Sequence, residues 1–221
     1  MNQWNKIYRF EKNKFISPRQ PLQKIITFFK KNNVKYILDL GCGVGGHSFY
    51  LAKNGFKVIG IDISKEAINL ARNKFIEEKE YDIKFLQHSM YERFPFKENF
   101  FDAVISLRTI NHGTEKQIRY AISEIKRVLR NNGYVFITVI KIKNFKKISL
   151  GKKTINNLPV EIVAPYTYIP LEGKEKGIVH FMFNEQTLRS FFKDFEIIKL
   201  WISYGQKSWE NYYCLLGKKK I

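Results

Sequence analysis

The chain has 221 residues, 44% of them hydrophobic and 15% aromatic, so it can bury one core and is too apolar to be intrinsically disordered. Its two cysteines exclude a disulfide framework and a cysteine-rich metal cluster, while its formal net charge of +19 would attract phosphate-rich partners or anionic surfaces. No apolar run approaches the roughly 20 residues of a membrane-spanning helix and no secretory signal is visible, so we expect a single cytoplasmic domain without a membrane span.

The first predicted element is a mostly helical segment, which we treat as an N-terminal helical cap over residues 1–33. One apolar helix face recurs there at the i, i+3, i+4, i+7 spacing. Its members are Leu22, Ile25, Ile26 and Phe29. Prolines at positions 18 and 21 mark the start of that helix, because proline is tolerated in a first helical turn.

Short apolar strands and helices then alternate over residues 34–140. The predicted strands cover residues 36–40, 56–61, 83–86, 101–106 and 134–140. Ser64 and Thr114 are of the type that caps a helix N-terminus, and each stands just before a helical pattern. Alternation with short connections indicates a parallel sheet with helices on both faces. We therefore predict a three-layer, doubly wound α/β core over these residues.

The pattern changes after Ile140. Residues 141–180 are basic, contain several Pro and Gly residues and show little periodicity, so we interpret them as a lid-like insertion over a substrate site. Residues 181–221 then provide a helix capped by Asn184 and two strands, at about 195–202 and 211–217. These strands are expected to form an antiparallel pair at one edge of a mostly parallel seven-stranded sheet.

A glycine turn, Gly41-Cys42-Gly43-Val44-Gly45-Gly46, follows the first strand and opens a helix, so its N–H groups face a ligand. With Asp62 about twenty residues further on, the spacing also allows a dinucleotide. Asp39 distinguishes the two ligands, because its carboxylate would repel a pyrophosphate but suits the α-ammonium of a methionine moiety. The turn therefore favours S-adenosylmethionine over NAD.

Four motifs follow one another between residues 36 and 140. They are Leu38-Asp39-Leu40-Gly41-Cys42-Gly43-Val44-Gly45, Ile59-Gly60-Ile61-Asp62-Ile63-Ser64, Phe94-Pro95-Phe96 through Phe101-Asp102-Ala103-Val104, and Ser123-Glu124-Ile125-Lys126-Arg127-Val128-Leu129 through Gly133. In order and spacing they resemble the class I S-adenosylmethionine-dependent methyltransferases, particularly the type-11 methyltransferase domain group. The resemblance implies S-adenosylmethionine as cofactor, S-adenosylhomocysteine as product, and no metal.

The same resemblance assigns the cofactor contacts. They fall on Asp39, Gly41, Cys42, Gly43, Asp62, Ile63, Ser89, Met90 and Leu107. The glycine turn and Asp39 would surround the methionine portion, Asp62 would bind both ribose hydroxyls, and Ile63 would pack on the adenine. The family usually places an acidic residue after the third strand, where this chain has His88-Ser89-Met90. We expect Ser89 or a neighbouring backbone group to hold the adenine instead, with Met90 packed on the ring.

The candidate acceptor contacts are Trp4, Tyr8, His112 and His180. His112 follows the fourth strand at its carboxyl end, where open parallel sheets bind ligands, and is the candidate general base. His180 stands at the end of the insertion and is expected at the same pocket mouth. Hydrogen-bonded structural roles for the histidines, and simple burial of the aromatic rings, are the alternatives.

Methyl transfer is a direct displacement at a sulfonium carbon, so positioning in a dry pocket supplies most of the acceleration and no covalent nucleophile is required. We predict a small-molecule acceptor, because the core carries one insertion and no appended RNA-binding domain. A tRNA or rRNA acceptor is the alternative, suggested by the charge of +19 and by the lysines of segments 141–153 and 218–220. A non-catalytic cofactor-binding protein with the same fold is the third possibility.

Overall fold

The computed structural model of the chain describes residues 3–10, 20–141, 150–155, 157–204 and 211–220. Within them, seven strands form one large sheet. They are β1 (Tyr36–Leu40), β2 (Lys57–Asp62), β3 (Ile83–Gln87), β4 (Phe101–Leu107), β5 (Leu129–Ile140), β10 (Phe195–Tyr204) and β11 (Asn211–Lys219). Their order across the sheet is β10-β11-β5-β4-β1-β2-β3.

The first five of these strands run parallel to one another. Strand β11 runs antiparallel to β5, and β10 runs antiparallel to β11 at the edge. The predicted mostly parallel seven-stranded sheet with an antiparallel C-terminal pair is therefore confirmed. Strand β5 begins at Leu129, earlier than predicted, because that residue pairs with Phe101 before the chain bends at Asn132.

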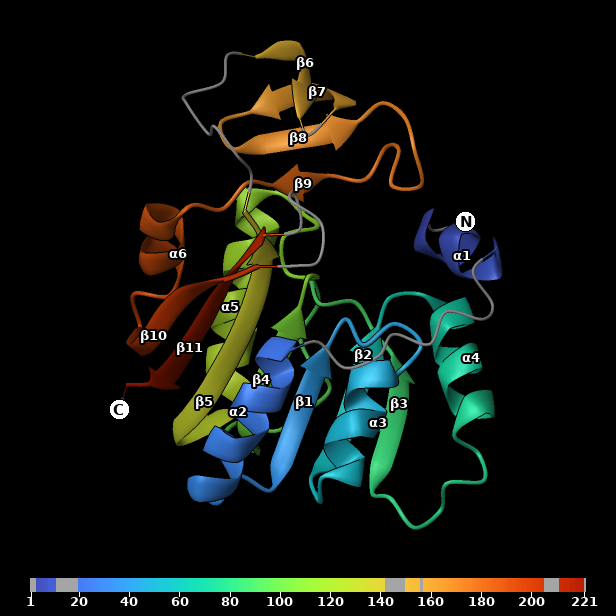
Figure 1. Ribbon diagram of the computed structural model, residues 1–221, viewed down its shortest axis with the longest axis vertical. Coiled ribbons are helices and arrows are strands. Elements are labelled where there is room, and N and C mark those ends of the chain that lie inside the picture. Colours follow the sequence, from blue (N-terminus) through green and yellow to red (C-terminus); the bar gives the residue numbers. More distant parts are fainter. Residues whose placement is uncertain (1–2, 11–19, 142–149, 156, 205–210, 221) are drawn as a thin grey trace.

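Helices cover both faces of the large sheet (Figure 1). They are α2 (Gln20–Lys31), α3 (Gly46–Lys53), α4 (Lys65–Lys74), α5 (Glu115–Val128) and α6 (Glu185–Phe191). Helices α2 and α3 pack on one face with Ile37 of β1, whereas α5 and α6 pack on the other face with the adjacent Leu38. Because successive strand residues point to opposite faces, these neighbours belong to two different cores.

The helix N-termini agree with the predicted caps. The Ser64 side chain accepts the backbone N–H of Ala67, and Thr114 and Asn184 each complete a capping box with the residue three positions later. No helix within the described residues has both the length and the apolar character needed to cross a membrane.

The insertion differs from its prediction. Its described part forms a second, four-stranded antiparallel sheet rather than irregular loop: β6 (Gly151–Ile155), β7 (Leu158–Ala164), β8 (Thr167–Pro170) and β9 (His180–Phe181). Val160 and Ile162 are buried on one side of β7, while the alternate residues Glu161 and Val163 are exposed. This short alternation was the sequence signal for a strand. Residues 142–149, which hold part of the predicted lysine-rich segment, lie outside the described residues.

The smaller sheet lies beyond the carboxyl ends of the central parallel strands (Figure 1). The backbone N–H of Phe181 in β9 donates to the carbonyl of Asn111, in the loop after β4, at 2.7 Å. At the same end of the large sheet lies α1 (Gln3–Phe10), whose Asn5 accepts the Ser64 hydroxyl at 2.7 Å. The insertion and the N-terminal helix are thus both attached around the edge where the parallel strands end.

Candidate functional site

A cavity of about 470 Å³ lies at this carboxyl edge, within the roughly 300–1,000 Å³ range of small-molecule and cofactor sites. It brings together most of the residues that the sequence assigned to the cofactor and acceptor. They are Trp4, Tyr8, Gly41, Cys42, Gly43, Asp62, Ile63, Ser89, Met90, Leu107 and His112. Residues from the N-terminal helix, from the ends of four strands and from the insertion therefore line one pocket.

The glycine turn is held against β2 and the loop after β4. The backbone N–H groups of Gly41 and Cys42 both donate to the carbonyl of Ile61, at 2.8 and 3.0 Å. Gly41 has a φ of 75°, and a Cβ on it would come within 2.7 Å of the Thr109 Cβ and Oγ1 atoms. Only glycine fits both the left-handed backbone and this close approach. The turn is therefore a fixed part of the pocket wall.

Asp62 ends β2 and points its carboxylate at the turn. One oxygen accepts the Gly43 N–H at 2.9 Å and the other accepts the Ser64 N–H at 2.8 Å. Burial raises the pKa of Asp62, and these two N–H groups counteract part of the rise. A carboxylate has about four lone-pair positions, so each oxygen keeps capacity for one more donor from the cavity. The side chain can accept two hydroxyls at once.

Asp39 lies directly behind the residues that line the cavity. Its carboxylate is only 2% exposed and accepts the hydroxyl of Ser48, in α3, at 2.5 Å. Burial raises the pKa of Asp39 to about 7; the Ser48 hydrogen bond opposes this rise, and the nearby charge of Asp62 adds to it. The acidic groups of Asp39 and Asp62 favour a cationic group in the pocket over an anionic one.

The segment after β3 supplies another part of the wall. Ser89 and Met90 line the cavity together with Ile63 and Leu107. The Ser89 hydroxyl accepts the N–H of Tyr91 at 3.1 Å, and its own O–H can still donate to a ligand. This arrangement suits a flat heteroaromatic ring, since an apolar side chain and a hydrogen-bonding hydroxyl stand next to each other.

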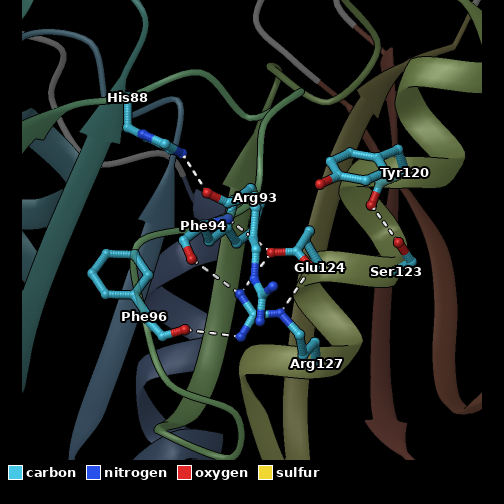
Figure 2. Close-up of polar contacts among 8 residues, drawn as sticks. All are labelled: His88, Arg93, Phe94, Phe96, Tyr120, Ser123, Glu124 and Arg127. Atoms are coloured by element: carbon cyan, nitrogen blue, oxygen red, sulfur yellow. Dashed lines mark hydrogen bonds and ion pairs between the residues drawn. The ribbon is translucent and has the colours of Figure 1, made fainter.

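The chain that leaves this segment is clamped to α5, as Figure 2 shows. Arg127 donates to the carbonyls of Phe94 and Phe96, at 3.0 and 2.8 Å. Glu124 accepts the Phe94 N–H at 2.8 Å and pairs with Arg127 at 2.7 Å. The Arg127 hydrogen bond is the main reason that the pKa of Glu124 is lowered. These motif residues position the pocket wall without touching the cavity, a role that the sequence did not reveal.

The acceptor end of the pocket is aromatic and contains two histidines. The His112 ring centroid lies 4.8 Å from Trp4 and 4.8 Å from His180. His180 is buried behind His112, stacks on Tyr168 and places Nε2 3.3 Å from a carboxylate oxygen of Glu175. The structure thus brings both predicted histidines to one place, with His112 on the cavity side.

Burial favours the neutral form of both imidazoles. Burial is the largest cause that lowers the pKa of His112 far below its usual value, with smaller contributions from His180 and Arg108. Burial also lowers the pKa of His180 to about 4. A neutral imidazole can accept a proton or ligate a metal, whereas an imidazolium can do neither.

Some lining residues were missed from the sequence. Arg108 and Thr109 follow β4 directly, and their position at a strand's carboxyl end was a signal that could have identified them. Lys174 and Glu175 come from the insertion, between β8 and β9. Nothing in the spacing of the insertion marks them, because the fold of the second sheet alone brings them to the cavity.

Comparison with known proteins finds similarity to methyltransferases. Residues 37–133 match the family model of a methyltransferase domain. Demethylmenaquinone methyltransferase of Lactococcus lactis subsp. lactis (strain IL1403) is 38% identical over 104 residues, 45% of this chain and 39% of that protein. The tRNA (carboxymethyluridine(34)-5-O)-methyltransferase of Arabidopsis thaliana is 38% identical over 105 residues, 47% of this chain and 23% of that protein. The chain spans about half the length, or less, of the curated relatives it matches.

A solved structure matches nearly the whole chain. Burkholderia thailandensis 1,6-didemethyltoxoflavin-N1-methyltransferase, with bound 1,6-didemethyltoxoflavin and S-adenosylhomocysteine, superposes with a TM-score of 0.68. The match covers 91% of this chain and 78% of that chain, at 15% identity. At that identity the similarity shows the shared fold alone, including the arrangement of the strands around the pocket.

Proposed function

We propose that this chain is a class I S-adenosylmethionine-dependent methyltransferase that transfers the methyl group of S-adenosylmethionine directly to a small-molecule acceptor. The observation that carries the proposal is the Asp62 carboxylate. It lies at the end of β2 beside the glycine turn, with capacity to accept two hydroxyls from the cavity. A ribose presents two adjacent hydroxyls of this kind.

The other groups around the pocket fit the rest of the cofactor. The methionine portion would lie along the turn at Gly41 and Gly43, where Asp39 behind the turn attracts its ammonium group. The adenine would lie between Ile63 and the segment at Ser89 and Met90. In this arrangement the serine hydroxyl replaces the acidic residue that usually binds the adenine amino group.

The reaction needs alignment more than it needs reactive side chains. A lone pair of the acceptor forms a bond to the methyl carbon while the carbon–sulfur bond breaks, and the sulfonium becomes a neutral thioether. An apolar pocket that holds the two partners in line accelerates such a step. Where the acceptor must lose a proton, neutral His112 on the cavity side is the candidate general base.

A small acceptor is supported by the walls of the pocket. Trp4 and Tyr8 of α1 and Lys174 and Glu175 of the insertion line the same cavity as the cofactor residues, so residues 141–180 would act as a lid over the acceptor. The menaquinone-pathway relative and the toxoflavin neighbour act on small molecules according to their names. These similarities support the class of acceptor without identifying it.

An RNA acceptor is the second candidate. It is supported by the net charge of +19 and by the plant relative that is named as a tRNA methyltransferase. A non-catalytic cofactor-binding protein would share the pocket but would transfer no methyl group.

One assay distinguishes the three candidate functions. The protein and radiolabelled S-adenosylmethionine are incubated with either a metabolite extract or unmodified total RNA. Label in the low-molecular-weight fraction is the expected result. Label in RNA, reduced steeply by added salt, would favour the second candidate. Binding of S-adenosylhomocysteine without transfer to either fraction would indicate a non-catalytic protein and contradict the proposal.

A further inference from the structure

Three potential metal ligands meet at the acceptor end of the pocket. The ligand atoms of His112, Glu175 and His180 all lie within 4.8 Å of one another. They come from the loop after β4, the β8–β9 connection and β9 itself, so the tertiary fold alone brings them together. Two imidazoles and one carboxylate form a donor set typical of zinc and other divalent transition metals.

His180 provides an independent observation. Its side chain is 3% exposed, and its Nε2 atom has no hydrogen-bond partner within the described part of the chain, although a Glu175 oxygen lies 3.3 Å away. Buried polar atoms are nearly always satisfied, so an unsatisfied one points to a partner such as an ion. His180 is also one of the three residues whose ligand atoms lie within 4.8 Å of one another.

The surrounding side chains hold the two rings in place. His180 stacks on Tyr168 with a centroid distance of 4.9 Å, and Trp4 lies against His112 at 4.8 Å. The Tyr91 hydroxyl donates to the backbone carbonyl of His112. Ligands that are fixed by neighbouring groups before binding lose little freedom when a metal binds.

We propose that His112, Glu175 and His180 bind a divalent transition-metal cation. Ligand atoms at about 2.1 Å from a tetrahedral metal lie roughly 3.4 Å from one another. The His180–Glu175 pair already has a separation of 3.3 Å, and all three ligand atoms lie within 4.8 Å of one another, so metal binding would require the third ligand atom to move closer. Three protein ligands leave a coordination position open toward the cavity, which His112 and Glu175 line.

The open position defines a class of acceptor. A bound cation lowers the pKa of a hydroxyl or thiol that coordinates to it. The acceptor's O–H or S–H bond then breaks with its proton passing to water, and the freed lone pair attacks the methyl carbon as the carbon–sulfur bond breaks. In this arrangement the cation replaces His112 as the group that activates the acceptor. This role rests on the proposed methyltransferase function, whereas the metal site does not.

The test is a titration of the full, tag-free chain, stripped of metal by a chelator, with Co²⁺ followed by absorption and with Zn²⁺ followed by calorimetry. We expect one equivalent to bind and Co²⁺ to give the visible bands of a four- or five-coordinate site. Glu175→Gln and His180→Ala should each weaken binding at least tenfold. His88→Ala, which removes another pocket histidine, should leave it unchanged.

Binding of S-adenosylhomocysteine by each variant, measured in parallel, shows that the variant is folded and keeps the two proposals distinct. If the wild type binds the nucleoside but neither Co²⁺ nor Zn²⁺, or if the Glu175 and His180 variants bind metal as well as the wild type, the metal site is wrong. If the wild type binds one metal equivalent that these variants lose, but binds no nucleoside, the metal site stands and the proposed function fails.

Discussion

Replacing Asp62 by asparagine tests the cofactor assignment with the least change in shape. The carboxylate accepts backbone N–H groups from Gly43 and Ser64, at 2.9 and 2.8 Å, and faces the cavity with its remaining lone pairs. An amide keeps one acceptor oxygen but points an NH₂ group at one of these N–H donors. We expect the protein to lose up to about 1–3 kcal/mol of stability.

The effect of the substitution on cofactor binding should be measurable separately from this loss of stability. Hydrogen bonds from two ribose hydroxyls to a charged acceptor would become bonds to a neutral amide. The expected loss of binding free energy is about 1.5–3 kcal/mol, or roughly a 10- to 150-fold increase in the Kd of S-adenosylhomocysteine. Adenosine has the same ribose and should lose a similar factor. Calorimetric titration at a temperature well below each variant's unfolding transition measures both ligands.

Asp102→Asn is the matched control. The Asp102 carboxylate also accepts two backbone N–H groups, from Lys35 and Tyr36 at 2.9 and 2.8 Å, but it stands at the start of β4, at the opposite edge of the sheet from the pocket. This variant should lose stability and keep its affinity for the nucleoside. An unchanged isotherm for Asp62→Asn, or an equal loss of affinity in both variants, would refute the ribose contact.

Three further predictions test the turn, its buried carboxylate and the clamp on α5. Gly41→Ala should lower the free energy of unfolding, measured by urea denaturation, by at least about 2 kcal/mol more than Gly55→Ala does. Both glycines have positive φ (75° and 89°), but only Gly41 is crowded by neighbouring atoms. Equal losses in the two variants would contradict the close approach at Gly41. The pKa of Asp39 is raised to about 7 without cofactor, and a bound ammonium should lower it. The free protein then holds this proton more tightly than the complex, so affinity should fall as the pH decreases through 7. Calorimetry in buffers of different ionisation enthalpy should detect proton release in the wild type but not in Asp39→Asn, and an absence of buffer dependence in the wild type would contradict the assignment. Arg127→Met should lower the free energy of unfolding by about 2–3 kcal/mol, since it leaves Glu124 and two carbonyls without their main partner. If the losses from Arg127→Met and Glu124→Gln simply add in the double mutant, the result would argue against the clamp.

Most of the sheet was predictable because its signals are local. The cap residues Ser64 and Thr114 stand just before their helices, and the strand at residues 36–40 is apolar except for Asp39. Such patterns depend on residues a few positions apart, which the sequence displays directly.

The second sheet was not predicted because its stability comes from pairing across the insertion. Its alternation in β7 is only a few residues long, and Pro159 within it argues against a strand by composition. The strand forms because Val160 and Ile162 bury their side chains with Tyr168 of β8 and Met182 after β9. These contacts arise only when the whole insertion folds.

Some residues of the site were predictable from the sequence and others were not, for the same reason. Asp62, Ser89 and His112 follow the ends of parallel strands, where a ligand is expected, so their positions could be inferred from the order of the elements. Glu175 and Arg127 could not be assigned to the site, because the first depends on the fold of the insertion and the second acts through backbone carbonyls far away in the sequence.

A crystal structure of the full chain with S-adenosylhomocysteine tests the central claim most directly. We predict that both ribose hydroxyls lie within hydrogen-bond distance of the Asp62 carboxylate, with the adenine beside Ile63 and the sulfur directed toward His112. A nucleoside bound elsewhere on the protein, or this cavity without ligand at a saturating concentration, would contradict the account.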